Sequence, residues 1–593
     1  MEPFALLYRP GSTDGVEVLT GALSTVDTIA ELPATGTVLA LVPFRQIRER
    51  GFACVDDGTG LLALRVADRQ VLPVGLAAAL LPDVEVPVDG GFGADHYAET
   101  VRRVIDDEIG SGEGANFVIR RTFTAAIADY RLAHALSCFR RLLLGESGAY
   151  WTFLVHTGDR TLVGATPERH ISVRDGEAVM NPISGTLRYR RGGPTLPDVL
   201  GFLADGKETD ELAMVLDEEL KMMARVCPAG GRVDGPYLRP MARLAHTEYL
   251  IRGRTALDPR HILRETLFAP TVTGSPLENA CRVIARHERT GRGYYSGVAA
   301  LIGPGELDSA ILIRTADISA AGRVTIDVGA TLVRHSDPGA ETAETEAKAA
   351  ALLGALRGAG SPSGPAPLHL ARHPSVLAAL ARRNDSLAGF WLGDPPTSSE
   401  FAGRRALVVD AEDTFTAMLA LQLRSLGLAV DVVRYDEPAS ADHDLLVLGP
   451  GPGDPSDRRH PKIARLHDLA GAALTAGRPL LAVCLSHQIL AARLGLPLTR
   501  RARPNQGVQR EIDLFGRPEV VGFYNTFAAQ ASPSAAFEVA QDPATGEVHA
   551  LRGPAFASVQ FHPESVLTQH GPRILAELVG PLLARKPVAA IGS

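Results

Sequence analysis

The sequence has few cysteines and no long apolar run. Its five cysteines are widely scattered and form no C-x-x-C pair, so neither a disulfide framework nor a thiolate zinc site is expected. No uninterrupted apolar stretch approaches the roughly 18 residues that a membrane-spanning helix needs, which argues against a membrane partner. The segment Met1-Glu2-Pro3-Phe4 has no basic stretch followed by an apolar one. We therefore expect a cytoplasmic protein in a reducing compartment.

The chain also lacks an excess of positive charge. It has 60 Lys and Arg against 68 Asp and Glu, so its overall field does not attract phosphate backbones and nucleic acid is not an expected partner. With 22% charged and 45% hydrophobic residues, the composition is that of a globular protein rather than of a disordered chain or a coiled coil. At roughly 100 to 200 residues per domain, the length predicts a multidomain protein.

A stretch rich in Gly, Ser and Pro divides the chain. It runs from Arg357 to Leu368 and follows a helical pattern rich in Ala and Leu. We place a linker over residues 358–402, with a short helical stretch near Pro374 to Arg383 inside it. Two large domains are predicted on either side, over residues 1–357 and 403–593.

The downstream part reads as a doubly wound α/β domain. Short continuous apolar runs typical of buried strands occur at Arg405–Asp410, Asp444–Gly449 and Pro479–Cys484, and amphipathic helical patterns such as Thr416–Leu426 separate them. Ligand chemistry is then expected at the carboxyl ends of the strands. The upstream part mixes strand patterns with long helices, at Ala213–Val226 and Glu341–Leu356, without regular alternation, and predicts an α+β fold.

Three features of the downstream domain together suggest a nucleophilic site. Cys484 ends a strand and opens a helix, where unpaired N–H groups favour a thiolate. The glycine-rich loop GPGPGDP at residues 449–455 follows another strand and can form an oxyanion hole. His562 and Glu564 offer an imidazole and a carboxylate that orients it. Taken singly, these are also consistent with a buried thiol, a tight turn and a core histidine.

In this order, the three features resemble the class I glutamine amidotransferases, over about residues 403–585. The resemblance implies that Cys484 attacks the amide of L-glutamine, His562 transfers the proton and Glu564 orients His562, so that ammonia is released. It also implies N–H groups of Gly453 and Leu485 as the oxyanion hole. Gln488 and the segment Tyr524-Asn525-Thr526, in particular Thr526, match positions that bind the glutamine substrate. The familiar G-x-C-x-G pattern departs here, because Ala482 and Ser486 replace the glycines.

Two pairs of acidic residues stand out upstream. Glu208 and Glu211 are neighbours on one helix face, and the same spacing recurs at Glu341 and Glu344, with Lys348 one turn later. Each pair alone is typical of a solvated surface. If the pairs converge, four carboxylates require a compensating cation, and all-oxygen ligands suit Mg²⁺.

The sequence around these pairs, including PISGT at residues 182–186, resembles chorismate-utilising enzymes of the anthranilate synthase type, over most of residues 1–356. The resemblance implies that Glu211 and Glu344 bind Mg²⁺ directly and that Glu208 and Glu341 act partly through metal-bound water. Thr331 departs, because a glycine is common there. The residues that match the chorismate pocket or the ring are Gly185, Thr186, His246, Thr271, Tyr295, Arg314, Gly329 and Lys348. Arg314, in the strand-like Ile311–Thr315, could grip a carboxylate with two N–H groups.

Asn116 bears on the nucleophile. It falls where water-adding relatives carry a lysine that deprotonates water, and an asparagine cannot act as a base. Ammonia already has a usable lone pair, so Asn116 favours amination over hydration.

Long segments, among them FAPTVTGSPLENACRVI and RGYYSGVAALIG, look closest to the fused 2-amino-2-deoxyisochorismate synthases of phenazine and related antibiotic pathways. These aminate chorismate at C2 and release the product, and the likeness also implies a homodimer. Three alternatives stay open: a complete anthranilate synthase that also eliminates pyruvate, an aminodeoxychorismate synthase, and a non-catalytic scaffold. The segment Leu6-Leu7-Tyr8-Arg9 lacks the L-L-E-S feature associated with tryptophan inhibition.

Overall fold

The computed structural model describes residues 2–93, 96–190, 193–241, 244–358, 368–393, 398–438, 442–532 and 536–584. The chain divides into two compact units, which confirms the prediction of a multidomain protein. Unit 1 comprises Met1–Ile109, Glu113–Glu219 and Asp234–Ala381, and unit 2 comprises Gly110–Gly112, Leu220–Val233 and Arg382–Ser593. Among the described residues, no helix has the length and apolar character to cross a membrane.

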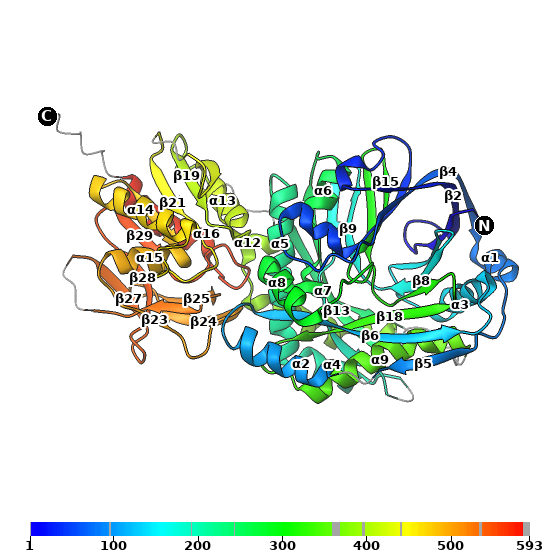
Figure 1. Ribbon diagram of the computed structural model, residues 1–593. Helices are drawn as coiled ribbons and strands as arrows, with labels where there is room; N and C mark the ends of the chain where they lie inside the picture. The colour runs from blue at the N-terminus through cyan, green and yellow to red at the C-terminus, as the bar shows by residue number, and fades with distance from the viewer. Residues whose placement is uncertain are drawn as a thin grey trace. The chain divides into compact units, whose positions relative to one another are not determined.

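Unit 1 is built on a large antiparallel sheet with helices against it, as the α+β prediction requires (Figure 1). Its strands pair in the order β5-β6-β18-β17-β8-β7-β1-β2-β4-β3-β15-β16-β9-β10-β13-β11. Bounds are β1 Phe4–Tyr8, β2 Gly15–Val26, β3 Val38–Val42, β4 Leu61–Pro73, β5 Val88–Phe92, β6 Asn116–Ile127, β7 Trp151–His156, β8 Arg160–Thr166, β9 Arg169–Arg174, β10 Glu177–Met180, β11 Ile183–Arg188, β12 Arg232–Pro240, β13 Leu244–Arg254, β14 Gly274–Ser275, β15 Val298–Gly303, β16 Glu306–Ile311, β17 Thr315–Ser319 and β18 Arg323–Leu332.

The helices of unit 1 lie against this sheet, and two of them carry the predicted acidic pairs. Helices α3 and α9 share one apolar core with β6, β17 and β18. Helix α9 starts where the Asp337 carboxylate accepts a hydrogen bond from the Ala340 N–H, and Pro338 follows at the first position. Bounds are α1 Val74–Leu80, α2 Tyr97–Arg103, α3 Leu132–Gly145, α4 Leu196–Leu203, α5 Gly206–Val226, of which the residues from Leu220 on are assigned to unit 2, α6 Pro259–Glu265, α7 Pro270–Thr273, α8 Leu277–Glu288 and α9 Pro338–Arg357.

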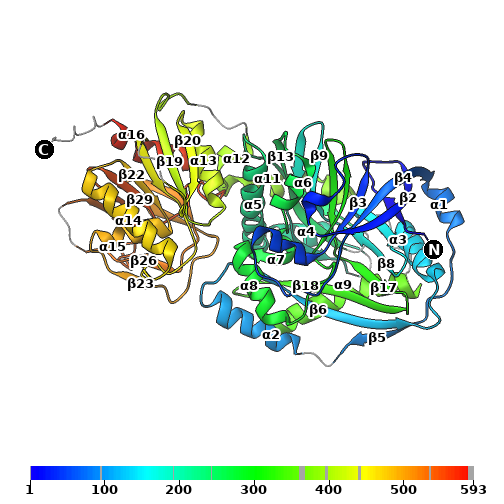
Figure 2. The same cartoon turned by 45° about the horizontal axis from the view of Figure 1, so that its top comes forward.

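Unit 2 contains the predicted doubly wound sheet, in the order β20-β19-β21-β22-β29-β28-β27. The first five strands are parallel, and β28 and β27 add antiparallel strands at one edge. Strand residues alternate between two apolar cores: Val408 packs with α13 and α16, and Leu407 with α14 and α15. Helices therefore cover both faces (Figure 2). Bounds are α13 Phe415–Ser425, α14 Pro461–Ala476, α15 Leu485–Arg493, α16 Gly571–Leu583, β19 Arg405–Asp410, β20 Ala429–Arg434, β21 Leu445–Leu448, β22 Leu480–Val483, β23 Leu498–Arg500, β24 Val508–Asp513, β25 Pro518–Phe523, β26 Phe527–Ala529, β27 Glu538–Gln541, β28 Val548–Arg552 and β29 Phe556–Val559.

The predicted linker is mostly helical between Leu368 and Leu392. They are α10 (Leu368–Ala371), α11 (Pro374–Arg382), a 3-10 turn (Arg383–Ser386) and α12 (Gly389–Leu392). Residues 359–367, which include most of the Gly/Ser/Pro stretch, lie outside the described residues. Apolar side chains of α10 and α11 pack in unit 1 with α4 and with residues of β11 and β13.

Candidate active sites

Cys484 sits at a sharp turn at the carboxyl end of β22. Its backbone has φ 54° and ψ −106°, a left-handed conformation that is rare for a residue with a side chain, and α15 starts at the next residue. The thiol is buried, with 5% of the residue exposed. The turn places the sulfur at a helix N-terminus, as the sequence predicts, and Leu485 directly follows it.

Ser486, one of the two departures from the glycine pattern, is accommodated by a specific contact. Its hydroxyl donates a hydrogen bond of 2.6 Å to the carbonyl of Gly449, in the glycine-rich loop after β21. The serine thereby ties the turn of Cys484 to this loop. In the same loop Gly453 has φ +130°, which glycine adopts without strain.

His562 and Glu564 form a buried, hydrogen-bonded pair in unit 2. The imidazole Nδ1 lies 2.8 Å from Oε1 of Glu564, and 1% and 0% of the two side chains are exposed. Burial opposes the charged imidazole, but the charges of Cys484 and Glu564 outweigh it and raise the pKa of His562 well above its ordinary value. Because the carboxylate accepts the Nδ1 proton, Nε2 is the nitrogen left to serve Cys484. The ring also packs against Phe415, at 4.4 Å between centroids.

The two predicted glutamine-binding residues lie near Cys484. Gln488, in the first turn of α15, donates hydrogen bonds to the Phe527 carbonyl and to Gln560 Oε1, at 2.8 Å and 3.0 Å. Gln560 in turn reaches the Cys484 sulfur at 3.7 Å. Thr526 lies between β25 and β26, in the same segment as Tyr524, whose carbonyl is 3.8 Å from that sulfur. Gln560 is a neighbour of the nucleophile that the sequence reasoning did not single out.

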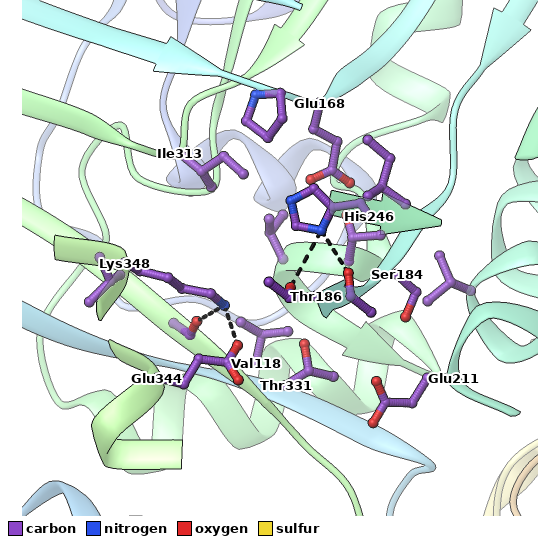
Figure 3. A pocket seen from close by; sticks show the side chains of 18 of the residues that line it. Val118, Glu168, Ser184, Thr186, Glu211, His246, Ile313, Thr331, Glu344 and Lys348 are labelled. Atoms are coloured by element: carbon purple, nitrogen blue, oxygen red, sulfur yellow. Dashed lines mark hydrogen bonds and ion pairs between the residues drawn. The ribbon is translucent and has the colours of Figure 1, made fainter. Parts of the chain in front are cut away.

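In unit 1, one cavity of about 410 Å³ gathers the predicted chorismate and metal residues (Figure 3). This volume suits a small ligand. The strands and helices that line it are far apart in the sequence, from β6 to α9. The predicted residues on its wall are Asn116, Gly185, Thr186, Glu208, Glu211, His246, Thr271, Tyr295, Arg314, Gly329, Glu341, Glu344 and Lys348, and Thr331 lines it too.

The four predicted metal carboxylates share this cavity but do not form a closed cage. Within the described parts of the chain, no three His, Cys, Asp or Glu side chains are already arranged to hold a metal ion. Glu344 is turned toward Lys348, at 2.8 Å, as Figure 3 shows. Gly185 has φ +74°, and a Cβ there would overlap the Glu208 carboxylate. A side chain at position 185 would therefore have to displace this carboxylate, and the positive φ independently favours glycine there.

Arg314 and His246 form the polar centre of the cavity. The Arg314 guanidinium donates to Nε2 of His246 at 3.1 Å, and the imidazole Nδ1 donates to the Gly185 carbonyl at 2.6 Å. Burial and the charge of Arg314 lower the pKa of His246 to about 3, so the ring is neutral with its proton on Nδ1. Arg314 is not in a strand, contrary to the sequence prediction. It lies between β16 and β17 with φ +51°, a turn that directs its side chain into the cavity.

Glu168 is a cavity residue that the sequence reasoning missed. It lies between β8 and β9, and only 5% of the residue is exposed. Burial raises the pKa of its carboxyl to about 7, against the opposing effects of Thr271 and Arg314. Figure 3 labels it among the side chains that line the cavity. A single acid after a strand is no signal among 68 acidic residues; only the burial distinguishes it.

Asn116 begins β6 at the cavity wall. The residue is 3% exposed, and its buried Oδ1 accepts no hydrogen bond from the described residues. Lys348 also lines the cavity, and its ammonium donates a hydrogen bond of 2.7 Å to the Gly329 carbonyl. The wall thus offers a buried acceptor in addition to its cations.

Comparisons with known proteins agree with this geometry. A family model described as chorismate binding enzyme matches residues 82–354, and one described as glutamine amidotransferase class-I matches residues 407–580. Proteins named "Anthranilate synthase, phenazine specific" from Pseudomonas chlororaphis and Pseudomonas fluorescens are each 56% identical over 617 residues, covering 99% of this chain and 96% of theirs. The chain belongs to the family of these anthranilate synthases, in which a chorismate-binding part and a class I glutamine amidotransferase share one chain.

A more distant member of the group shares both parts as well. The protein named "Anthranilate synthase" from Azospirillum brasilense is 32% identical over 528 residues, which cover 84% of this chain and 66% of that protein. The family assignment confirms the predicted resemblance and fold class, and it makes the chain a chorismate-utilising, glutamine-dependent enzyme.

Proposed function

We propose that the chain converts chorismate and L-glutamine to 2-amino-2-deoxyisochorismate, adding ammonia at C2, in the biosynthesis of a phenazine-like antibiotic. The observation that carries the proposal is Asn116: the acceptor in the wall of the cavity is a neutral amide rather than a base, while the same chain holds a Cys-His-Glu site that liberates ammonia. The names of the Pseudomonas relatives support the phenazine pathway.

In unit 2, Cys484 attacks the amide carbon of glutamine. The C–N bond breaks as His562 gives the leaving amine a proton, and water then cleaves the thioester to glutamate. Glu564 keeps Nδ1 protonated and stabilises the imidazolium. N–H groups of Gly453 and Leu485 would receive the oxyanion, as the family likeness implies.

The carboxylate-lined end of the cavity fits Mg²⁺. The donors are all oxygen, and Mg²⁺ usually binds through one or two protein carboxylates plus water and substrate oxygens, so an open set of ligands is what this ion needs. Glu211 and Glu344 would bind it directly, and Glu208 and Glu341 through water. Bound there, the ion would neutralise the ring carboxylate and assist loss of the C4 hydroxyl.

Glu168 supplies the proton for the leaving hydroxyl. With a pKa of about 7, about half of this carboxyl is protonated near neutral pH, whereas a carboxyl at its ordinary value is almost fully ionised. As ammonia adds at C2 and the double bonds shift, the C4–O bond breaks and the hydroxyl leaves as water. Arg314 grips a substrate carboxylate, and Oδ1 of Asn116 accepts an N–H of ammonia.

The state of His246 favours release of the aminated intermediate. Elimination of pyruvate needs groups that take and give protons, and both nitrogens of His246 are engaged, by Gly185 and Arg314. With a pKa of about 3 the ring carries no imidazolium proton at neutral pH and is a weak base, and its one remaining proton, on Nδ1, is bound to the Gly185 carbonyl. His246 therefore holds Arg314 in place beside the ring of chorismate.

The remaining features follow from the family likeness. We place the protein in the cytoplasm as a homodimer. Ammonia protonated in bulk water is a poor nucleophile, so an enclosed passage that delivers NH₃ explains why one chain carries both activities.

The direct test is incubation of the purified chain with chorismate, glutamine and Mg²⁺, following pyruvate and the mass of the product. A non-aromatic amino acid that retains the enolpyruvyl group, without pyruvate, is expected. Stoichiometric pyruvate with fluorescent anthranilate would instead establish a complete anthranilate synthase. This is the second candidate function, and it is favoured by the words "Anthranilate synthase" in the names of the Pseudomonas relatives.

A further inference from the structure

The part of the linker that belongs to unit 2, Arg382–Leu392, packs beside the segment that carries His562 and Glu564. The indole N–H of Trp391 donates a buried hydrogen bond of 2.9 Å to the backbone carbonyl of Glu564. The Ala388 N–H donates one of 2.7 Å to the Val566 carbonyl. Trp391 and Ala388 are 2% and 0% exposed, so neither bond competes with water.

Two glutamine side chains extend this attachment. Gln509 donates hydrogen bonds to both the Ser386 and the Leu567 carbonyls, at 2.7 Å each. It thereby bridges the linker to the segment that carries His562 and Glu564. Gln569 donates 2.8 Å to the Asp385 carbonyl. Residues 385–391 therefore hold residues 564–569 at four places along their length.

On its other side the segment of His562 and Glu564 is fixed by β25. The His562 N–H donates to the Gly522 carbonyl at 2.9 Å, and the Gly522 N–H donates to the Thr568 hydroxyl at 3.0 Å. The two ends of the segment are thus held by β25, while the carbonyl of Glu564, between them, is held by the linker. Since the Glu564 carboxylate must stay within hydrogen-bond reach of His562, a shift of less than about 1 Å at its backbone disrupts the pair.

We propose that Trp391 is a positioning residue of the glutaminase: its indole N–H fixes the backbone of Glu564, so that the linker is a structural part of the glutaminase site and not only a tether. The inference rests on the glutaminase activity proposed above. It assigns the linker a role that the family models do not cover, because residues 355–406 lie between their matched ranges.

The test compares three variants of the full-length chain by glutamate release in the presence of chorismate and Mg²⁺. Trp391→Phe removes the N–H and keeps an aromatic ring. Trp391→His restores a ring N–H on a smaller ring. Phe390→Leu is the matched control. Phe390 packs edge-on against Trp391, at 4.7 Å between ring centroids, so this substitution alters the same apolar contact but leaves the indole N–H in place. Active sites are counted by labelling Cys484 with an alkylating glutamine analogue.

We expect Trp391→Phe to lower kcat per labelled site roughly 10-fold with KM for glutamine unchanged, and Trp391→His to recover part of the loss. Phe390→Leu should stay within about 2-fold of wild type in kcat. Amination with external ammonium should be unchanged in all three. The proposal would be overturned if Trp391→Phe and Phe390→Leu lowered kcat equally, or if Trp391→Phe were more active than Trp391→His. In either case packing alone would account for the data.

Two further readouts keep the outcomes distinct. If Trp391→Phe fails to fold, shown by loss of labelling, the comparison of Trp391→His with Phe390→Leu decides in the same way. If wild type releases glutamate no faster than Cys484→Ala, the proposed function itself fails, and the role of Trp391 falls with it.

Discussion

Cys484 combines a strained backbone, a helix N-terminus and an imidazole partner, and its removal should separate the two activities of the chain. Cys484→Ala is expected to lower glutamine-dependent amination by at least about 10³-fold, because no other group can form the thioester. Amination with ammonium at high pH should persist, since unit 1 is untouched. The measurement is product formation with each nitrogen donor.

Cys54→Ala is the matched control for this prediction, because Cys54 is a half-buried thiol of unit 1 outside the chorismate cavity. It should leave both activities unchanged. Glutamine-dependent amination by Cys484→Ala at near wild-type rate would contradict the assignment of the nucleophile.

Glu168 offers a second test at the residue scale. Glu168→Gln keeps the shape of the side chain but removes its acidic proton, so amination with ammonium should fall roughly 10² to 10⁴-fold while glutamate release continues. Glu177→Gln, a partly exposed acid that pairs with Arg252, is the control and should be neutral. Unchanged amination in Glu168→Gln would remove Glu168 as the proton donor.

The same variant should change stability with a defined sign. The folded pKa of Glu168, about 7, lies above its ordinary value of 4.5, so the folded state keeps a proton that the unfolded state has lost between these values. Stability is therefore lost as pH rises through this window. Glu168→Gln removes the penalty, so its Tm should exceed that of wild type at pH 8 and match it at pH 4.

At the scale of elements, α5 and α9 each bring two carboxylates to the cavity. Glu211→Gln and Glu344→Gln should each raise the Mg²⁺ concentration for half-maximal amination roughly 10 to 100-fold and leave glutamate release unchanged. Glu346→Gln, on the same helix as Glu344 but with 58% of its side chain exposed, is the control. Calorimetric titration with Mg²⁺ in the presence of chorismate provides a readout besides activity. An unshifted Mg²⁺ dependence in both variants would place the ion elsewhere.

The order of the elements of unit 2 could largely be predicted from the sequence, whereas in unit 1 the sequence indicated only a mixture of strands and long helices. The buried strands of unit 2 follow from continuous apolar runs, and the helices α5 and α9 from helix-forming residues and from caps such as Asp337-Pro338, which act locally. Local patterns did not reveal the turn of Arg314 or the buried state of Glu168, because both depend on strands that meet only in the folded sheet. The Ser486 hydroxyl bond to Gly449 was equally hidden, since it joins the start of α15 to a loop 37 residues away in the sequence.

The sequence also indicated which residues form the candidate sites, but not which hydrogen bonds and ion pairs they make with one another. The types and spacings indicated which side chains carry the chemistry. That His246 has both nitrogens engaged, and that Glu344 is turned to Lys348, depends on distances of about 3 Å that no spacing in a sequence encodes. The linker shows the same limit: its helices were partly expected, but not the hydrogen bond from Trp391.

At the scale of the whole molecule, a chain that delivers its own ammonia should discriminate against ammonia from solution. With glutamine labelled with ¹⁵N at the amide and an excess of unlabelled ammonium at pH 7, most of the product should carry ¹⁵N, because released NH₃ reacts before it equilibrates with bulk water. Mass spectrometry of the product gives the ratio. Product with the isotope ratio of the bulk solution would show that ammonia escapes first, and Cys484→Ala, fed the same mixture, supplies the unlabelled reference.

The buried linker bears on how such a chain can arise by gene fusion. Leu370, Val376 and Leu380 complete a core in unit 1, and Ala388 and Trp391 are buried in unit 2. A recombination event that joined two ready-made genes through an arbitrary spacer would supply neither set of contacts. A laboratory attempt to divide this enzyme into two polypeptides should therefore keep residues 382–392 on the amidotransferase reading frame.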